Sequence, residues 1–294
     1  MSRAVTTVER ALERYGTPVY VRRQIVHNSR VVDDLTRRGA VFVDEVDDVP
    51  PGSVVVLSAH GVAPAVRAAA ARRGLRTVDA TCPLVTKVHR EAAAYADAGY
   101  DILLIGEAGH DEVVGTTGIA PERITVVPGT AAAATVEVTD PGRVVWLAQT
   151  TLTVDETARV AGVLRERFPL LVDPPSDDIC YAAQNRQAGA RRLAAESDVV
   201  LVVGSSGSHN SLRLVDVATA AGVPARLVEG GPDVRAEWLT GASVVGLTAG
   251  ASAPREAVDE VLTTLAGLGY AEVRTVEVAR EGQVFTLPRE LDVT

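Results

Sequence analysis

Short apolar runs that alternate with helical patterns are the feature that most constrains the fold of this chain. Runs of β-favouring residues stand at 19–22, 53–58, 101–106, 144–149, 198–204 and 243–250. Most are continuously apolar, as strands buried on both faces of a parallel sheet are. Helical patterns lie at 62–73, 84–97, 154–167, 182–195, 210–221 and 254–267. This alternation predicts an α/β fold with mostly parallel sheets and right-handed crossovers.

The alternation recurs at a coarse period of roughly ninety residues, which indicates repeated α/β units. The two cysteines, Cys82 and Cys180, are separated by a similar distance along the chain. We therefore place domain boundaries near residues 82 and 178. The expected segments are a first α/β domain at 1–82, a second at 83–177, a third at 178–270, and a C-terminal tail at 271–294 that packs back on an earlier domain.

Composition and charge exclude several classes of protein. Hydrophobic residues make up 47% of the 294 residues and charged residues 23%, which is typical of a soluble globular chain. The net charge of −9 argues against a nucleic-acid partner, which selects a basic surface. The first residues form an amphipathic helical pattern without the apolar centre of a signal peptide, and no apolar run approaches the ~20 residues of a membrane span. We expect a cytoplasmic protein with no membrane partner.

Polar side chains follow the ends of the predicted strands. In open α/β sheets, ligands bind beyond the carboxyl ends of the strands. Four of the five histidines lie at such positions, whereas His89 lies within a helical pattern. The polar residues at these ends are His27, His60, His110, Glu112, Thr150, Ser208, His209, Asn210 and Ser252.

Two loops of small residues stand between a buried run and a helical pattern, "GSSGSHNS" (204–211) and "TAGASAP" (248–254). Their backbone N–H groups and hydroxyls can surround an anion at a helix N-terminus. A tight turn that needs small residues explains one such loop equally well. Neither loop is a nucleotide-binding motif. With the histidines, the two loops favour a small phosphorylated ligand.

Glu112 is the best candidate for a general acid, since it lies two residues after His110 at a predicted strand end. The alternative is a solvated carboxylate at a helix start, where the helix dipole favours negative charge. The cysteines have a plain alternative as well, because thiols often serve as small buried hydrophobes. Both follow an acidic residue and precede a helical pattern, and this match favours a shared function. No CxxC pattern supports a zinc or dithiol site.

Several stretches in order resemble the LytB family of 4-hydroxy-3-methylbut-2-enyl diphosphate reductases. The resemblance runs essentially from end to end. Its most specific parts are "DATCPLVTKVH" (79–89) and "DDICYA" (177–182). The other matching stretches are "IVHN" (25–28), "SAHGV" (58–62), "GHDEVVGTTG" (109–118), "QTTL" (149–152) and "TAGASAP" (248–254).

The resemblance implies three similar α/β domains arranged as a cloverleaf around a central [4Fe–4S] cluster, with one cysteine ligand from each domain. Cys82 and Cys180 match two of these ligands. It implies a small diphosphate substrate whose hydroxyl leaves as water after two electrons and two protons enter, giving isopentenyl diphosphate and dimethylallyl diphosphate in the last step of the non-mevalonate isoprenoid pathway. The electrons would come from a donor such as ferredoxin or flavodoxin.

Carried over by position, His27, His60, His110, Ser208, Asn210 and Ser252 match residues that bind the diphosphate. Thr150 matches a threonine near the hydroxymethyl group, and Glu112 matches the glutamate that delivers a proton. His209 stands where the family usually has serine, and Gly207 where it usually has asparagine. A histidine can still donate to phosphate, so we include His209 in the site.

The family's first cluster cysteine would lie three residues before Met1, and we expect the third ligand there, upstream of this sequence. The family strand that precedes that cysteine lies inside the first sheet, so we expect unpaired backbone groups in that sheet. The alternative to an upstream start is a truncated or inactive paralogue that binds a small diphosphate without redox activity.

Overall fold

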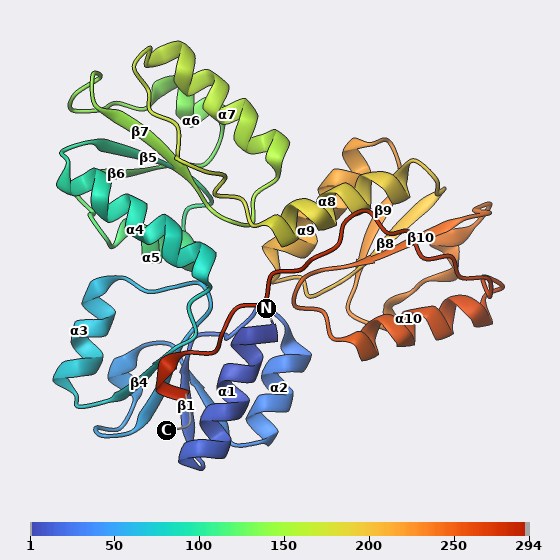
Figure 1. Cartoon of the computed structure of the whole chain (residues 1–294). Coiled ribbons are helices and arrows are strands. Elements are labelled where there is room, and N and C mark those ends of the chain that lie inside the picture. Colours follow the sequence, from blue (N-terminus) through green and yellow to red (C-terminus); the bar gives the residue numbers. More distant parts are fainter. Residues whose placement is uncertain (1, 292–294) are drawn as a thin grey trace. The chain divides into compact units, whose positions relative to one another are not determined.

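The structure is a computed structural model that describes residues 2–291, and it contains three parallel sheets with helices on their faces (Figure 1). The described chain forms two compact units. The first comprises residues 2–26, 32–180 and 285–291, and the second comprises residues 27–31 and 181–284. The predicted α/β class with parallel sheets is confirmed. The predicted domain boundaries at 82 and 178 stay a prediction. Each sheet lies within one predicted domain, but the compact units place both of the first two sheets together.

The first sheet lies in the first unit and has the strand order β2-β1-β3-β4, all parallel. Its strands are β1 (Val19–Arg22), β2 (Ala40–Val43), β3 (Val54–Leu57) and β4 (Arg76–Asp79). The helices α1 (Ser2–Tyr15) and α2 (Ser29–Arg37) cover one face and α3 (Pro64–Arg72) lies on the other, with the 3-10 turn η1 at Val46–Asp48 (Figure 1).

Both inner strands of this sheet are paired on both sides. β1 bonds to β2 and β3, and β3 bonds to β1 and β4. The expectation of an unpaired position inside the first sheet is therefore wrong for the described strands, since the ladder is continuous from β2 to β4.

The second sheet also lies in the first unit, with the order β6-β5-β7. Its strands are β5 (Asp101–Ile105), β6 (Ile124–Val127) and β7 (Val144–Ala148), and its helices are α4 (Pro83–Asp97), α5 (Asp111–Thr117), α6 (Thr130–Thr135) and α7 (Val154–Arg167). The central position of β5, covered on both faces, explains its continuous apolar run. Ile102 and Leu104 pack with α4 on one face, and Leu103 and Ile105 pack with α6 and α7 on the other.

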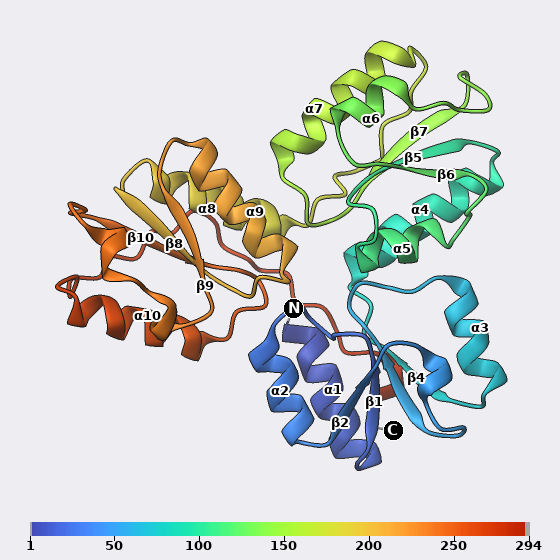
Figure 2. The same cartoon turned by 180° about the vertical axis from the view of Figure 1, so that it is seen from behind.

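The third sheet forms the core of the second unit, with the order β10-β8-β9. Its strands are β8 (Val199–Val203), β9 (Ala225–Val228) and β10 (Val245–Ala249), its helices are α8 (Tyr181–Ala194), α9 (His209–Ala220) and α10 (Arg255–Gly267), and its 3-10 turns are η2 (Gly231–Asp233) and η3 (Ala236–Leu239). Figure 2 shows α8 and α9 on one face and α10 on the other. Val200 and Val202 of β8 pack beneath α8 and α9, while Leu201 packs with α10.

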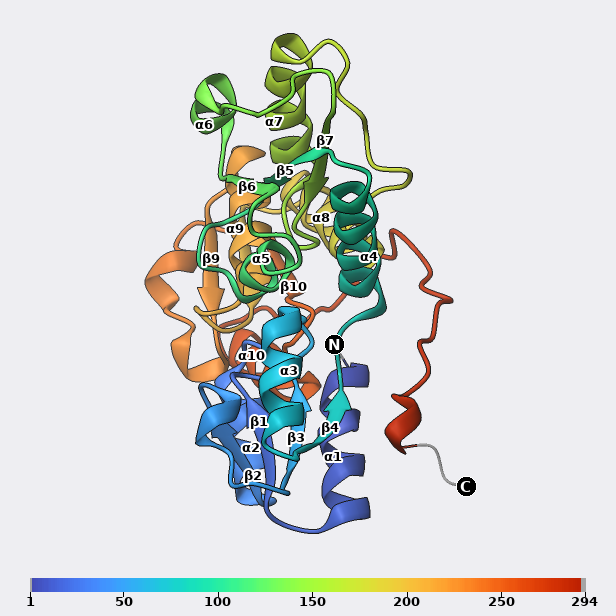
Figure 3. The same ribbon diagram turned by 90° about the vertical axis from the view of Figure 1, so that its left-hand side faces the viewer.

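The chain after α10 has no helix or strand until the 3-10 turn η4 (Arg289–Leu291). The end of this tail belongs to the first unit and lies beside α1 (Figure 3). The hydroxyl of Tyr15 donates to the carbonyl of Glu290 at 3.0 Å, and Arg3 donates to the carbonyl of Thr286 at 2.6 Å. Among residues 2–291, none of the helices has the length and apolarity that crossing a bilayer requires.

Candidate active site

The candidate residues lie at the carboxyl ends of parallel strands, as predicted. In the first unit His60 follows β3, His110 follows β5 and Thr150 follows β7. In the second unit Ser208, His209 and Asn210 follow β8 and Ser252 follows β10, while His27 lies five residues beyond β1. Because all strands of a parallel sheet end at one edge, each sheet gathers its polar residues there.

Close packing through glycine brings His60 to His110. The turn after β3 contains Gly61 at φ +78, where an added Cβ would lie 2.7 Å from the ring of His89 on α4. At the end of α5, a Cβ on Gly118 would lie 2.3 Å from the Cβ of Ala63. The two segments can approach this closely only because glycine has no side chain. The ring centroids of His60 and His110 are consequently 5.6 Å apart, edge to face.

His110 caps the helix on which Glu112 lies. Its Nδ1 accepts a hydrogen bond of 3.1 Å from the backbone N–H of Glu112, the role that a side-chain oxygen has in common N-caps. With Nδ1 as the acceptor, the proton of the neutral ring is at Nε2. The ring is 6% exposed, so its donor direction is fixed by the cap.

The carboxyl group of Glu112 is buried and held by one residue. Thr150 donates to it twice, from its backbone N–H at 2.7 Å and from its hydroxyl at 2.9 Å. Burial raises the pKa of Glu112 from 4.5 to about 7, while the two bonds from Thr150 act to lower it and the negative charge of Asp178 adds a smaller rise. A carboxyl group with this pKa can hold and release a proton near neutral pH. The alternative of a solvated helix-start carboxylate is wrong, since Glu112 is 2% exposed.

The two cysteines occupy matching positions in the first unit. Cys82 is the N-cap of α4, and its N–H donates to the carbonyl of Ala59 at 3.0 Å. Cys180 directly precedes α8, and its N–H donates to the carbonyl of Thr150 at 2.9 Å. Both are partly exposed and neither forms a disulfide, so the alternative of fully buried thiols is wrong. The backbone of Cys180 is thus hydrogen-bonded to Thr150, the residue that holds Glu112.

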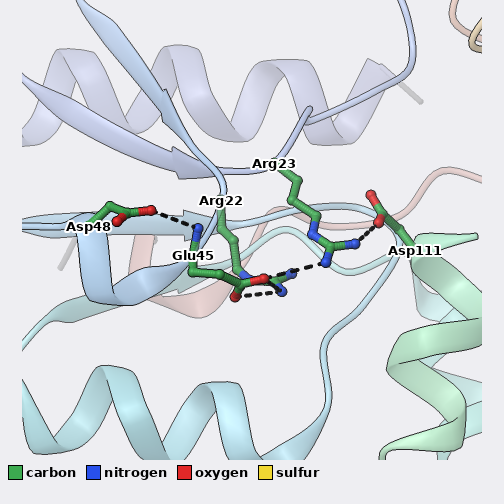
Figure 4. Close-up of polar contacts among 5 residues, drawn as sticks. All are labelled: Arg22, Arg23, Glu45, Asp48 and Asp111. Carbon is green, nitrogen blue, oxygen red and sulfur yellow. Dashed lines mark hydrogen bonds and ion pairs between the residues drawn. The ribbon is translucent and has the colours of Figure 1, made fainter. Parts of the chain in front are cut away.

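An ion-pair network fixes the start of α5 from the first sheet (Figure 4). The guanidinium of Arg22 donates to both carboxylate oxygens of Glu45 at 2.8 Å. Arg23, in the left-handed region at φ 54, donates to Glu45 at 3.4 Å and to the carboxylate of Asp111. Asp111 stands between His110 and Glu112, so this bridge ties the end of β1 to the helix start that carries both.

In the second unit, glycines at two strand ends enclose the start of α9. An added Cβ on Gly204 or on Gly250 would lie 2.2 or 2.0 Å from the hydroxyl oxygen of Ser211. Ser208 is the N-cap, and the hydroxyl of Ser211 donates to its oxygen at 3.0 Å. The ends of β8 and β10 therefore pack closely against the first turn of a 12-residue helix, whose N-terminus attracts anions.

Asn210 and Ser252 complete this strand-end group. The side-chain nitrogen of Asn210 is buried and makes no hydrogen bond within the described residues, although buried amides are nearly always bonded. The hydroxyl of Ser252 donates to the carbonyl of His27 at 3.3 Å. The rings of His27 and His209 are 6.5 Å apart. The unit thus gathers two hydroxyls, an amide and two imidazoles, a donor set that suits phosphate oxygens.

Comparison with known proteins places the chain in a family. The family model described as LytB protein matches residues 1–266. A 4-hydroxy-3-methylbut-2-enyl diphosphate reductase of Leifsonia xyli is 60% identical over 292 residues, which are 99% of this chain and 87% of that protein. The chain belongs to the LytB family.

Other relatives and solved structures support the same family assignment. The reductase of the same name from Mycolicibacterium paratuberculosis is 57% identical over 99% of this chain and 88% of its own length. The solved structure of a reductase from Plasmodium falciparum matches with a TM-score of 0.95 and 34% identity, over 99% of this chain and 92% of that one. A second solved reductase, described as the terminal enzyme of the non-mevalonate pathway, matches with a TM-score of 0.63 and 29% identity, over 90% of this chain and 94% of that one.

Two residues that hold the site in this LytB protein were not predicted from the sequence. Gln149 is 1% exposed, accepts from the N–H of Glu107 at 2.9 Å and donates to the hydroxyl of Thr151 at 2.9 Å, which fixes the loop of Thr150. Asp178 is buried beside Cys180, and its carboxylate accepts from the N–H of Ala148 at 2.8 Å. Both lie within stretches that resemble the family, and membership of these stretches was the signal in the sequence that could have identified them.

Proposed function

We propose that this chain reduces 4-hydroxy-3-methylbut-2-enyl diphosphate to isopentenyl diphosphate and dimethylallyl diphosphate. In this reaction the carbon–oxygen bond of the 4-hydroxyl group breaks, two electrons and two protons enter, and water leaves with the diphosphate intact. The site must therefore hold a diphosphate, deliver protons and receive electrons. Membership of the LytB family and the names of its close relatives support the proposal.

The observation that carries the proposed mechanism is the buried carboxyl group of Glu112 with a pKa of about 7. In its protonated form this group can donate a proton to the departing hydroxyl, which then leaves as water. The hydroxyl of Thr150, 2.9 Å from the carboxylate, would orient the substrate hydroxyl and Glu112 toward each other. Burial keeps bulk water away from the carboxyl group, so its proton goes to the substrate.

The diphosphate would bind to the strand-end residues. In the second unit the N-terminus of α9, the hydroxyls of Ser208 and Ser252, and His27 and His209 supply donors, and the unbonded nitrogen of Asn210 has room for one more acceptor. In the first unit His110 is set to donate from Nε2, because Nδ1 is occupied by the cap, and His60 lies beside it. Together these hydrogen-bond donors can hold the negatively charged diphosphate without a lysine.

The donor chemistry of the two cysteines fits an iron–sulfur cluster. Both thiols are partly exposed, each directly precedes a helix, and neither is committed to a disulfide. Cys82 and Cys180 would each ligate an iron of a [4Fe–4S] cluster. When bound, the cluster supplies the two electrons, one at a time, from a donor such as ferredoxin or flavodoxin. The helix N-termini behind both thiols favour its negative charge.

Anaerobic assay of the purified protein tests the proposal. With 4-hydroxy-3-methylbut-2-enyl diphosphate and a strong one-electron donor, we expect isopentenyl and dimethylallyl diphosphate by mass spectrometry. We also expect a brown protein with iron and sulfide in a ratio of about 4:4. A colourless protein that binds the diphosphate and yields neither product would contradict the proposal and favour a non-redox paralogue.

A further inference from the structure

Lys87 is the only lysine in a chain whose other 28 basic residues are all arginine. It lies on α4, five residues after Cys82. Its side chain is 24% exposed, which is low for a lysine. The single lysine is therefore not part of a general solvated surface.

The ammonium group of Lys87 makes three hydrogen bonds to one short loop. It donates to the carbonyl of Ser176 at 2.8 Å, to the carbonyl of Asp177 at 3.2 Å and to a carboxylate oxygen of Asp178 at 2.6 Å. These residues directly precede Ile179 and Cys180. One side chain of the helix that starts at Cys82 thus holds the loop that carries Cys180.

The same loop is fixed from the opposite side by the second sheet. The other carboxylate oxygen of Asp178 accepts from the N–H of Ala148 at the end of β7, at 2.8 Å. The side chain of Asp178 is 1% exposed, so its charge depends on these partners. Glu91, one turn further along α4, lies 3.3 Å from the ammonium of Lys87, so two carboxyl groups share this one cation. The contacts link α4, β7 and the loop of Cys180.

The choice of lysine has a geometric reason. An ammonium group is compact and carries three rotatable donors, which suit three oxygens that surround one point. A guanidinium is planar, and its donors form a fixed fork that suits the two oxygens of one carboxylate. Two carbonyls and a carboxylate oxygen from successive residues match the three donors of an ammonium group.

We propose that Lys87 is a positioning residue that fixes the loop of Cys180 against the helix of Cys82, so that the two thiols keep the spacing that a cluster requires. The inference rests on the proposed function for the identity of the cluster. The fastening of the loop itself does not depend on it. Lys87 acts through the carbonyls of residues 176 and 177 and the carboxylate of Asp178.

Two variants and a control test this role. Lys87→Arg keeps the positive charge and changes the donor geometry. Lys87→Met with Asp178→Asn removes the tether together with the charge of the buried Asp178 side chain that it pairs, so it guards against a loss of folding. Arg165→Met is the control, since it removes an exposed ion pair of 2.8 Å to Asp173 in the same unit. Thermal unfolding checks that each variant is folded.

The first readout is the alkylation rate of each cysteine in the iron-free protein, followed by peptide mass spectrometry. Without its hydrogen bonds from a charged donor, the loop opens more often, and we expect Cys180 to react about tenfold faster in both test variants. Cys82, on the helix, should change by less than about twofold, because the tether acts on the loop. The control should match the parent protein at both positions.

The second readout is the half-time of iron loss after anaerobic reconstitution, which should shorten in both test variants and not in the control. Parent-like alkylation of Cys180 in Lys87→Arg and in the double variant would overturn the proposal, as would an equal effect in Arg165→Met. If the parent protein yields no reductase products, the proposed function fails. The alkylation rates still decide the role of Lys87 in that case.

Discussion

At the scale of single residues, Glu112 is the side chain with the most unusual environment. It is 2% exposed, Thr150 holds both of its oxygens, and none of its hydrogen-bond partners among residues 2–291 is a cation. Burial without a cation favours the neutral acid over the carboxylate. A residue selected for stability alone would not keep a carboxyl group in this place, which supports a role in proton delivery.

The raised pKa of Glu112 predicts a pH dependence of stability. Since the pKa is about 7 in the folded chain against an ordinary 4.5, the folded chain holds the proton more tightly than the unfolded chain does. The stabilisation is complete below about pH 4.5 and is lost as pH rises through about 7. Glu112→Gln removes this dependence, so from pH 4.5 to 8 it should gain up to about 3 kcal/mol relative to the parent protein. Urea unfolding at several pH values measures it, and parallel curves for the two proteins would refute it.

A second prediction at this scale concerns Asn210 and Ser252. Each offers a donor to the proposed diphosphate site, and removing one leaves a charged oxygen with one hydrogen bond fewer. Asn210→Ala and Ser252→Ala should each weaken diphosphate binding by about 1–3 kcal/mol. Titration calorimetry with the substrate measures this loss, and the visible spectrum of the cluster should stay unchanged. Unaltered affinity in both variants would place the ligand elsewhere.

At the scale of elements, the position of α5 depends on small residues. Gly115 and Gly118 face the turn after β3, where a Cβ on Gly115 would lie 3.2 Å from the carbonyl oxygen of Gly61. The start of α5 is held by the bridge from Arg23 to Asp111. Fixed at both ends, this seven-residue helix places His110 and Glu112 at the edge of the second sheet.

Gly118→Ala tests this packing. The backbone of Gly118 has helical dihedral angles, φ −68 and ψ −5, so alanine fits the backbone, but its Cβ would lie 2.3 Å from the Cβ of Ala63. We expect a loss of about 1–3 kcal/mol in the free energy of unfolding. Gly162→Ala is the matched control, because Gly162 lies within α7 with nothing within 4 Å of the added Cβ. The control should gain up to about 1 kcal/mol from helix propensity. Equal effects in both variants would argue against close packing at α5.

The sequence predicts the inner strands of each sheet and misses four of the six edge strands among the described residues. The six predicted strands form at 19–22, 54–57, 101–105, 144–148, 199–203 and 245–249. The amphipathic pattern at the N-terminus forms α1, and the other six predicted helices start within two residues of their expected starts. The strands that were not predicted are β2, β4, β6 and β9, and each lies at the edge of its sheet. β4 (RTVD), β6 (ITVV) and β9 (ARLV) are partly exposed and contain polar residues, so no continuous apolar run reveals them, and β2 (AVFV) is apolar but only four residues long. The other two edge strands, β7 and β10, lie within longer runs and were predicted. The helices α2, α5 and α6 were not predicted either, and each has no more than nine residues.

At the scale of the whole molecule, the sequence predicts where the candidate residues lie along the chain but not which of them meet. The strand-end rule identified His60, His110 and Thr150 without a structure. The partners of the site come from distant positions, as in the bond from Lys87 to Asp178 across 91 residues. Such pairs follow from tertiary packing, which local patterns do not contain.

The central claim is that Glu112 delivers the proton that lets the substrate hydroxyl leave as water, and steady-state turnover of Glu112→Gln under anaerobic conditions tests it most directly. Glutamine can keep both contacts to Thr150 and cannot release a proton. Turnover should fall by about 10²–10⁴-fold while the substrate still binds, and the parent activity should decline as pH rises through about 7. Glu122→Gln, the same change at an exposed residue, should leave turnover unchanged. Turnover of Glu112→Gln within a few-fold of the parent protein would contradict the account.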